Sequence, residues 1–140
     1  MSDQLYVVLL LIGVLIVGAV LWLVFSMRKD SSGLNKTYYQ SKWLEIENSL
    51  DKNNLHSYMT AIMSADKLVD DALKKSHFKG STMGERMKLA QKTWSNSDNI
   101  WRAHKIRNRL VHESDFELDR KYALVALSAY KQALKDLGAI

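Results

Sequence analysis

The densest group of chemically active side chains lies between His104 and His112. These nine positions hold two of the four histidines and two of the six arginines in the chain. Arginine offers a rigid fork that fits a phosphate, and histidine gains or loses a proton near neutral pH. Together they form a minimum set for RNA cleavage without a metal. A base removes the 2′-hydroxyl proton, that oxygen attacks the adjacent phosphate, and a cation stabilises the developing charge.

The spacing of these residues predicts how they share a helix. His104, Asn108 and His112 recur every four residues and so lie on one face. Arg107 borders that face, but it precedes His112 by five residues, which opens the two side chains by roughly 140° on an ideal helix. Two routes would bring them together: fraying of the helix at His112, or a second copy of the chain that completes the site.

The segment from Arg107 to His112 resembles the R-x(4–6)-H motif of the HEPN superfamily, with Asn108 as the polar residue that often follows the arginine. The flanking residues 101–106 and 113–116, and the upstream segment 65–73, are also similar to the family. The resemblance covers roughly residues 37–140. It implies an α-helical bundle that forms homodimers, with two motifs facing one cleft. It also implies a metal-independent endoribonuclease of toxin or defence type, with RNA as substrate and an antitoxin as partner.

The same resemblance implies roles for individual residues. Arg107 would hold the scissile phosphate, His112 would act as general base or acid, and Asn108 would orient them. Secondary contacts to the substrate are expected from His104, Arg109, Arg102 and Asp66. A purely structural interpretation remains open, in which His112 only favours the negative end of the helix dipole and Trp101 is a core residue.

Asp66 is a carboxylate in the middle of an otherwise apolar helical stripe. A buried carboxylate is costly unless it is paired. One interpretation is a structural salt bridge to a neighbouring helix, with Arg107 as partner. The other is that Asp66 supports the basic site from behind.

No metal or cofactor is expected. A zinc site built on His104 and His112 is poorly supported, because the two are eight residues apart rather than three to five and the chain has no cysteine. No glycine-rich phosphate loop, serine triad or paired-carboxylate motif is visible either.

The elements that must position these residues are helices. The chain has no proline to break them, and apolar residues recur at helical spacing after the first block. The sequence predicts an all-α bundle of four or five mostly antiparallel helices, because the loops are short. The expected helices span about 37–50, 55–76, 82–94, 99–112 and 119–137. Their expected caps are Thr37, Asn54, Thr82, Ser97 or Asp98, and Asp119, with left-handed stops at Gly80 and Gly138.

A long apolar segment precedes the bundle. Residues 5–25 contain no charged side chain. The run to Met27 would form about 34 Å of helix, enough for a bilayer core of about 30 Å. A cleaved signal peptide is disfavoured, because the apolar run is long, Asp3 replaces the usual positive charge, and no small-x-small site follows. The expected organisation is a transmembrane anchor over 1–28, a linker over 29–36 and the bundle over 37–140.

The distribution of charge predicts the orientation. Arg28, Lys29 and Lys36 follow the apolar segment, and no basic residue precedes it. The positive-inside rule therefore places the N-terminus outside and the bundle in the cytoplasm. The whole net charge of +5 comes from residues 31–140, which suits RNA or anionic lipid but also an ordinary soluble surface. A non-catalytic adaptor tethered to the membrane is the alternative function.

Overall fold

The computed structural model describes residues 2–27 and 33–140. It divides into two compact units, one ending at Ser31 and the other beginning at Ser32, and each is described by itself. The described residues form six α-helices and no strand, so the predicted all-α class is confirmed. Residues 29–32 of the expected linker, and residue 28 at the end of the expected anchor, lie outside the described residues.

The first unit is a single helix, α1 (Ser2–Met27). Its segment Gln4–Leu23 has a mean hydropathy of 2.9, and none of that window is buried. Among the described residues this is the one helix long and apolar enough to cross a membrane, although a signal sequence would meet the same criteria.

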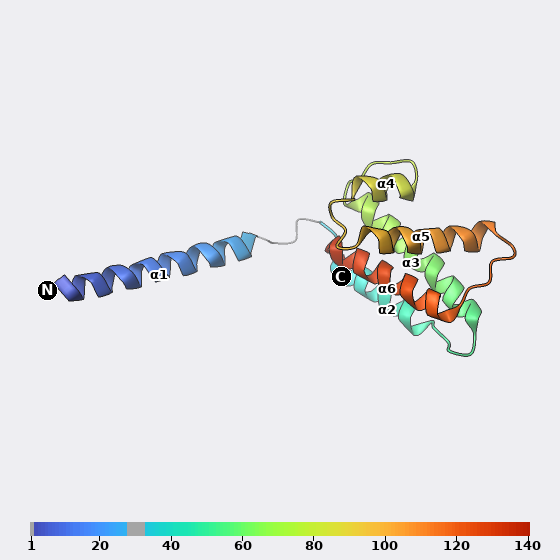
Figure 1. Cartoon of the computed structure of the whole chain (residues 1–140), viewed down its shortest axis with the longest axis horizontal. Coiled ribbons are helices and arrows are strands. Elements are labelled where there is room, and N and C mark those ends of the chain that lie inside the picture. Colours follow the sequence, from blue (N-terminus) through green and yellow to red (C-terminus); the bar gives the residue numbers. More distant parts are fainter. Residues whose placement is uncertain (1, 28–32) are drawn as a thin grey trace. The chain divides into compact units, whose positions relative to one another are not determined.

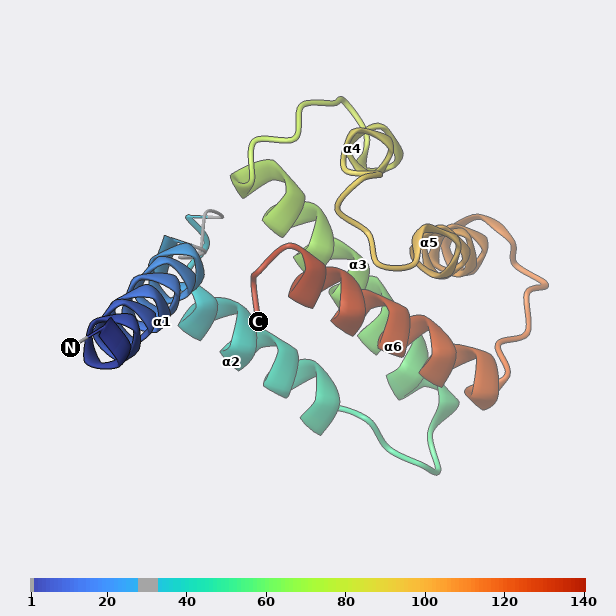
Figure 2. The same cartoon turned by 60° about the vertical axis from the view of Figure 1, so that its left-hand side comes forward.

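The second unit is a bundle of five helices. They are α2 (Lys36–Asn48), α3 (Leu55–Lys75), α4 (Met83–Leu89), α5 (Ser97–His112) and α6 (Arg120–Asp136). The central helix is α3, which packs against all four others. Helices joined by a short loop, α2 with α3 and α5 with α6, run antiparallel as predicted, whereas α3 and α6 run in the same direction (Figures 1 and 2).

The core of the bundle lies between α3 and the helices around it. Its largest fully buried side chains come from all five helices: Tyr39, Ile62, Val69, Leu73, Met87, Ile100, Tyr130 and Leu134. The predicted core positions of the third segment, Met83, Met87, Ala90 and Trp94, are all buried. This core belongs entirely to residues after Ser32, so the bundle does not depend on α1 for its packing.

Four helix ends follow the sequence prediction. The side chains of Asn54, Thr82 and Asp119 each accept a hydrogen bond from a backbone N–H in the first turn of α3, α4 and α6. Gly138 adopts a φ of 70° after α6, and the N–H of Ala139 reaches the carbonyl of Leu134 at 2.8 Å. This hydrogen bond closes the end of α6 in the manner typical of a left-handed glycine stop.

Other helix ends differ from the prediction by one to five residues. Asn35, not Thr37, caps α2, and Asn96, not Ser97 or Asp98, caps α5. Both errors have the same cause: several capping residues stand in a row, and Asn competes well with Ser, Thr and Asp for the position. At the end of α3 the left-handed residue is His77, with a φ of 65°, three residues before the expected Gly80. The third predicted helix is also shorter, because α4 ends at Leu89 and turns follow it.

Candidate functional site

Asp66 is the centre of a buried polar network that joins three helices. Its side chain, on α3, is only 5% exposed. Oδ1 lies 2.8 Å from Nδ1 of His104 and accepts a hydrogen bond of 2.8 Å from the hydroxyl of Tyr130. Oδ2 lies 3.1 Å from Nε of Arg107. The carboxylate therefore has partners on both oxygens, which is what makes its burial tolerable.

Both interpretations of Asp66 from the sequence meet in this geometry. Asp66 pairs with Arg107 on a neighbouring helix, and in doing so it lies directly behind the basic face of α5. The sequence did not predict Tyr130 as a member of the network, because a tyrosine in an apolar stripe is usually assigned to the core. The available signal was that a buried tyrosine hydroxyl usually finds a hydrogen-bond partner. On a helix that packs against a buried carboxylate, that carboxylate is the expected partner.

The network perturbs the tyrosine that serves it. Burial raises the pKa of Tyr130 far above its usual value, and the negative charge of Asp66 and the hydrogen bond to it raise it further. An unfolded tyrosine loses its proton near pH 10. The folded chain thus holds this proton above pH 10 while the unfolded chain releases it, so stability falls as the pH rises through that range.

We expect the free energy of unfolding to fall more steeply above pH 10 in the native protein than in Tyr130→Phe. The difference in slope should be about 1.4 kcal/mol per pH unit, the contribution of one proton. Urea unfolding at several pH values between 9 and 11 measures it. Parallel curves for the two proteins would contradict the assignment of this proton to Tyr130.

Arg107 is held on one side and open on the other. Its Nε is buried and faces Asp66 without the alignment of a hydrogen bond, so charge holds this contact. Nη1 donates to Oδ1 of Asn108 at 3.0 Å. The side chain is still 34% exposed, and Nη2 has no hydrogen-bond partner among the described residues. Arg107 can therefore offer a positioned N–H to an anion that arrives from solvent.

His104 has its tautomer fixed by the same carboxylate. An ionised carboxylate only accepts hydrogen bonds, so Nδ1 must carry the proton that points to Asp66. The neutral ring then presents Nε2 as an acceptor. The side chain retains 13% exposure, and Nε2 has no partner among the described residues. An imidazole oriented in this way can accept a proton from a bound molecule.

His112 does not join this network within one copy of the chain. It is exposed and is the last residue of α5, which remains helical to that point. Fraying of the helix, one of the two routes that would bring His112 to Arg107, is therefore wrong. The two side chains diverge by roughly 140° around the helix axis, so a shared site needs a second copy.

The remaining predicted contact residues lie on the exposed side of α5. Arg109 forms an ion pair of 2.8 Å with Glu113, and its guanidinium lies 4.1 Å from the ring centre of Phe116. Arg102 is exposed and makes no ion pair among the described residues. Both can reach a bound polyanion, but Arg109 would first have to leave Glu113.

Trp101 departs from the expectation that it is a core residue. It is 37% exposed, and its ring meets that of His104 edge to face at a centroid distance of 6.4 Å. An aromatic ring exposed beside a histidine and an arginine can stack on a nucleobase. Sequence periodicity could not show this, because Trp101 lies next to the core position Ile100 and α4 covers only part of it.

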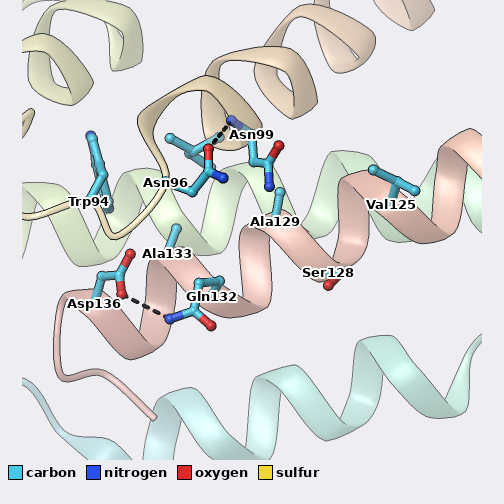
Figure 3. Close-up of a pocket in the computed structure, with 10 residues that line it drawn as sticks. Trp94, Asn96, Asn99, Val125, Ser128, Ala129, Gln132, Ala133 and Asp136 are labelled. Carbon is cyan, nitrogen blue, oxygen red and sulfur yellow. Dashed lines mark hydrogen bonds between the residues drawn. The ribbon is translucent and has the colours of Figure 1, made fainter.

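A separate hollow lies away from this network, between the start of α5 and the outer face of α6 (Figure 3). Its volume is about 270 Å³. Asn96 and Asn99 line one side, Gln132 and Asp136 the other, and its floor includes Ala129. Asn96 caps α5, and Asp136 accepts hydrogen bonds from Ser95 and Gln132. Both side chains are therefore already engaged within the fold. None of the predicted site residues borders it.

Neither metal ligands nor relatives add to this site. In residues 2–27 and 33–140 no group of three or more histidine, cysteine, aspartate or glutamate side chains is placed to hold a metal ion. No protein-family model, curated protein or solved structure matches the chain. The resemblance to the HEPN superfamily therefore stays a prediction from the sequence.

Proposed function

We propose that this chain is a membrane-anchored, HEPN-like endoribonuclease that cleaves RNA without a metal. The observation that carries the proposal is the buried carboxylate of Asp66, which holds Arg107 and His104 side by side on α5. The fixed guanidinium of Arg107 reaches solvent and supplies charge stabilisation, and the fixed imidazole of His104 beside it positions the substrate. Net positive charge on the bundle favours a polyanionic substrate.

Each side chain has a part in the proposed reaction. Arg107 binds the scissile phosphate and stabilises the charge that develops on it, and Asn108 keeps the guanidinium in place. The 2′-hydroxyl loses its proton to a histidine and attacks the phosphate. The P–O5′ bond then breaks, and the leaving oxygen takes up the proton that the histidine accepted. The products are a 2′,3′-cyclic phosphate and a 5′-hydroxyl.

Two histidines compete for proton transfer. His112 matches the family motif, but it would transfer a proton at a phosphate that is bound by Arg107 of a second copy. The active species would then be a homodimer. His104 lies beside Arg107 in the same copy and is held by Asp66. We favour His112 for proton transfer, because it is exposed and free to approach a bulky substrate, and assign His104 to positioning.

We expect His112→Ala to lower the cleavage rate by about 10²-fold or more, within the range for loss of a general acid or base. The full chain, reconstituted in a bilayer, would be incubated with a labelled RNA and EDTA. The matched control is His56→Ala, because His56 is an exposed histidine on α3. This variant should cleave RNA at the native rate. A larger loss in His104→Ala than in His112→Ala would transfer the role to His104. No cleavage by the native chain would refute the proposal.

Anchoring by α1 is part of the same proposal. The span Gln4–Leu23 is long and apolar enough to be retained in a bilayer, and the basic residues after it favour a cytoplasmic bundle. RNA is available on that side. A reporter enzyme fused after Ile140 should read as cytoplasmic, and an external reading would remove the substrate from reach.

A second candidate function is that of a non-catalytic adaptor, and the hollow on α6 favours it (Figure 3). Val125 lines this hollow and is 46% exposed, so it could contact apolar side chains of a partner. This function predicts that Val125→Arg abolishes the cellular phenotype, whereas Arg107→Ala leaves it intact. The ribonuclease predicts the reverse.

A further inference from the structure

Two segments of the bundle carry opposite charge. At one end, residues 74–92 contain six basic side chains and one acidic side chain, Glu85. At the other end, the loop of residues 113–119 contains four acidic side chains and no basic one. The first segment closes α3 and forms α4, and the second joins α5 to α6, so the two lie at opposite ends (Figure 1). We call residues 74–92 the basic lobe and residues 113–119 the acidic loop.

Internal pairing leaves three lysines of the basic lobe available. Arg86 is buried against Asp70, and Lys74 and Lys75 form ion pairs with Asp70 and Asp71. The other three basic residues, Lys79, Lys88 and Lys92, are exposed and have no ion pair among the described residues. Their charge is not neutralised by the fold, so it remains for a partner.

An exposed leucine lies among these lysines. Leu89, at the end of α4, is 61% exposed and stands between Lys88 and Lys92 in the sequence. An apolar side chain flanked by lysines is typical of segments that lie in the headgroup layer of a bilayer. The phosphate groups of RNA would bind the neighbouring lysines but would offer this leucine no apolar contact.

The chain enters the bundle at the end that carries the basic lobe. The first turn of α2 contacts the last turns of α3: Tyr39 donates to Asp71 at 2.7 Å, and Nζ of Lys75 lies 5.1 Å from the ring centre of Tyr38. Residues 28–35 connect α1 to this point and can span at most roughly 28 Å. An anchored bundle therefore keeps its basic end near the membrane surface.

We propose that the basic lobe docks on anionic lipid headgroups, with Lys79, Lys88 and Lys92 facing phosphate groups and Leu89 in the headgroup layer. The acidic loop is repelled by the same surface, which orients the bundle with α5 accessible from the cytoplasm. The inference rests on the anchoring part of the proposed function and not on RNA cleavage. Each lysine near an anionic surface contributes roughly a fivefold bias, so the three together favour the docked state roughly 100-fold.

The absence of cysteine allows a direct test. A single cysteine at Gln91→Cys places a fluorescent label in the basic lobe, and Ser114→Cys places it in the acidic loop. The full chain is reconstituted in nanodiscs of phosphatidylcholine, with or without phosphatidylglycerol, that carry a nitroxide quencher on the headgroup. We expect strong quenching at position 91 only in the anionic discs, loss of that quenching at high salt, and little quenching at position 114.

Charge-reversal variants identify the residues responsible. Lys79→Glu, Lys88→Glu and Lys92→Glu together should abolish the quenching at position 91. The matched control reverses three basic residues far from the lobe, Lys52→Glu, Arg120→Glu and Lys121→Glu, and should leave it unchanged. Both sets must keep the native melting temperature within a few degrees, as expected for exposed side chains.

Three outcomes would overturn the inference. Equal quenching at positions 91 and 114, or none in anionic discs, means that the lobe does not dock. A label at position 91 that responds to added RNA in neutral discs, and not to anionic lipid, means that the lobe binds RNA instead. If alkaline carbonate releases the chain from vesicles, α1 is no anchor, and the docking fails with it. If the vesicles retain the chain but the label at position 91 is not quenched, the docking is rejected and the anchoring by α1 stands.

Discussion

Replacing Asp66 with asparagine is expected to lower the free energy of unfolding of the bundle by about 3 kcal/mol. The substitution keeps the shape of the side chain and removes the charge that faces Arg107 and His104. The asparagine oxygen can still accept from Tyr130 and His104, but its NH2 group then takes the position that faces Nε of Arg107, where two donors meet. Since Arg107 is 34% exposed, its guanidinium regains some water, which keeps the loss at the lower end of the range for a broken buried pair.

Urea unfolding of residues 33–140, followed by circular dichroism, measures this change. That segment contains the whole core, so it is expected to fold without α1. The matched control is Asp115→Asn, an exposed carboxylate in the loop after α5, which should change the stability by less than about 0.5 kcal/mol. A loss below about 1 kcal/mol for Asp66→Asn would show that the network does not hold the three helices together.

Replacing Arg107 with alanine is expected to lower the rate of RNA cleavage by about 10²- to 10³-fold. Removal of one donor to the charge that develops in a transition state has an effect of this size. Arg107→Lys should recover only part of the rate, because lysine restores the charge but not the planar fork that contacts Asp66 and Asn108 together.

The control for this prediction is Arg120→Ala. Arg120 is an exposed arginine on α6, 5.7 Å from the ring centre of Tyr58, and its loss removes the same charge outside the Asp66 network. We expect less than a threefold change in rate for this variant. An equal effect of Arg107→Ala and Arg120→Ala would mean that net charge, and not a positioned guanidinium, governs the interaction with RNA.

The sequence predicted the helices well because most of their signals are local. The caps Asn54 and Asp119 and the stop at Gly138 act on the residues next to them, so the pattern is visible in the sequence. The prediction was wrong where several local signals competed, as at Asn35 with Thr37 and at the polar run from Ser95 to Asp98. Only the packing of the whole bundle selects one cap among equal candidates.

The candidate site was predictable only in part. Asp66 was conspicuous as a carboxylate in an apolar stripe, and Arg107 was its expected partner. The contribution of Tyr130 depends on the parallel packing of α3 and α6, which involves 64 residues of separation along the chain. The distinction between His104 and His112 likewise needs the structure, because both share a face by spacing and only His104 lies over Asp66.

The chemistry at the ends of the cleaved RNA tests the central claim most directly. The full chain in a bilayer would be incubated with a defined RNA in EDTA, and the product ends would be identified by mass spectrometry. Attack by the 2′-hydroxyl predicts 2′,3′-cyclic phosphate and 5′-hydroxyl ends, produced by the native chain and lost in Arg107→Ala. Intact RNA, or products with 3′-hydroxyl ends, would contradict the account.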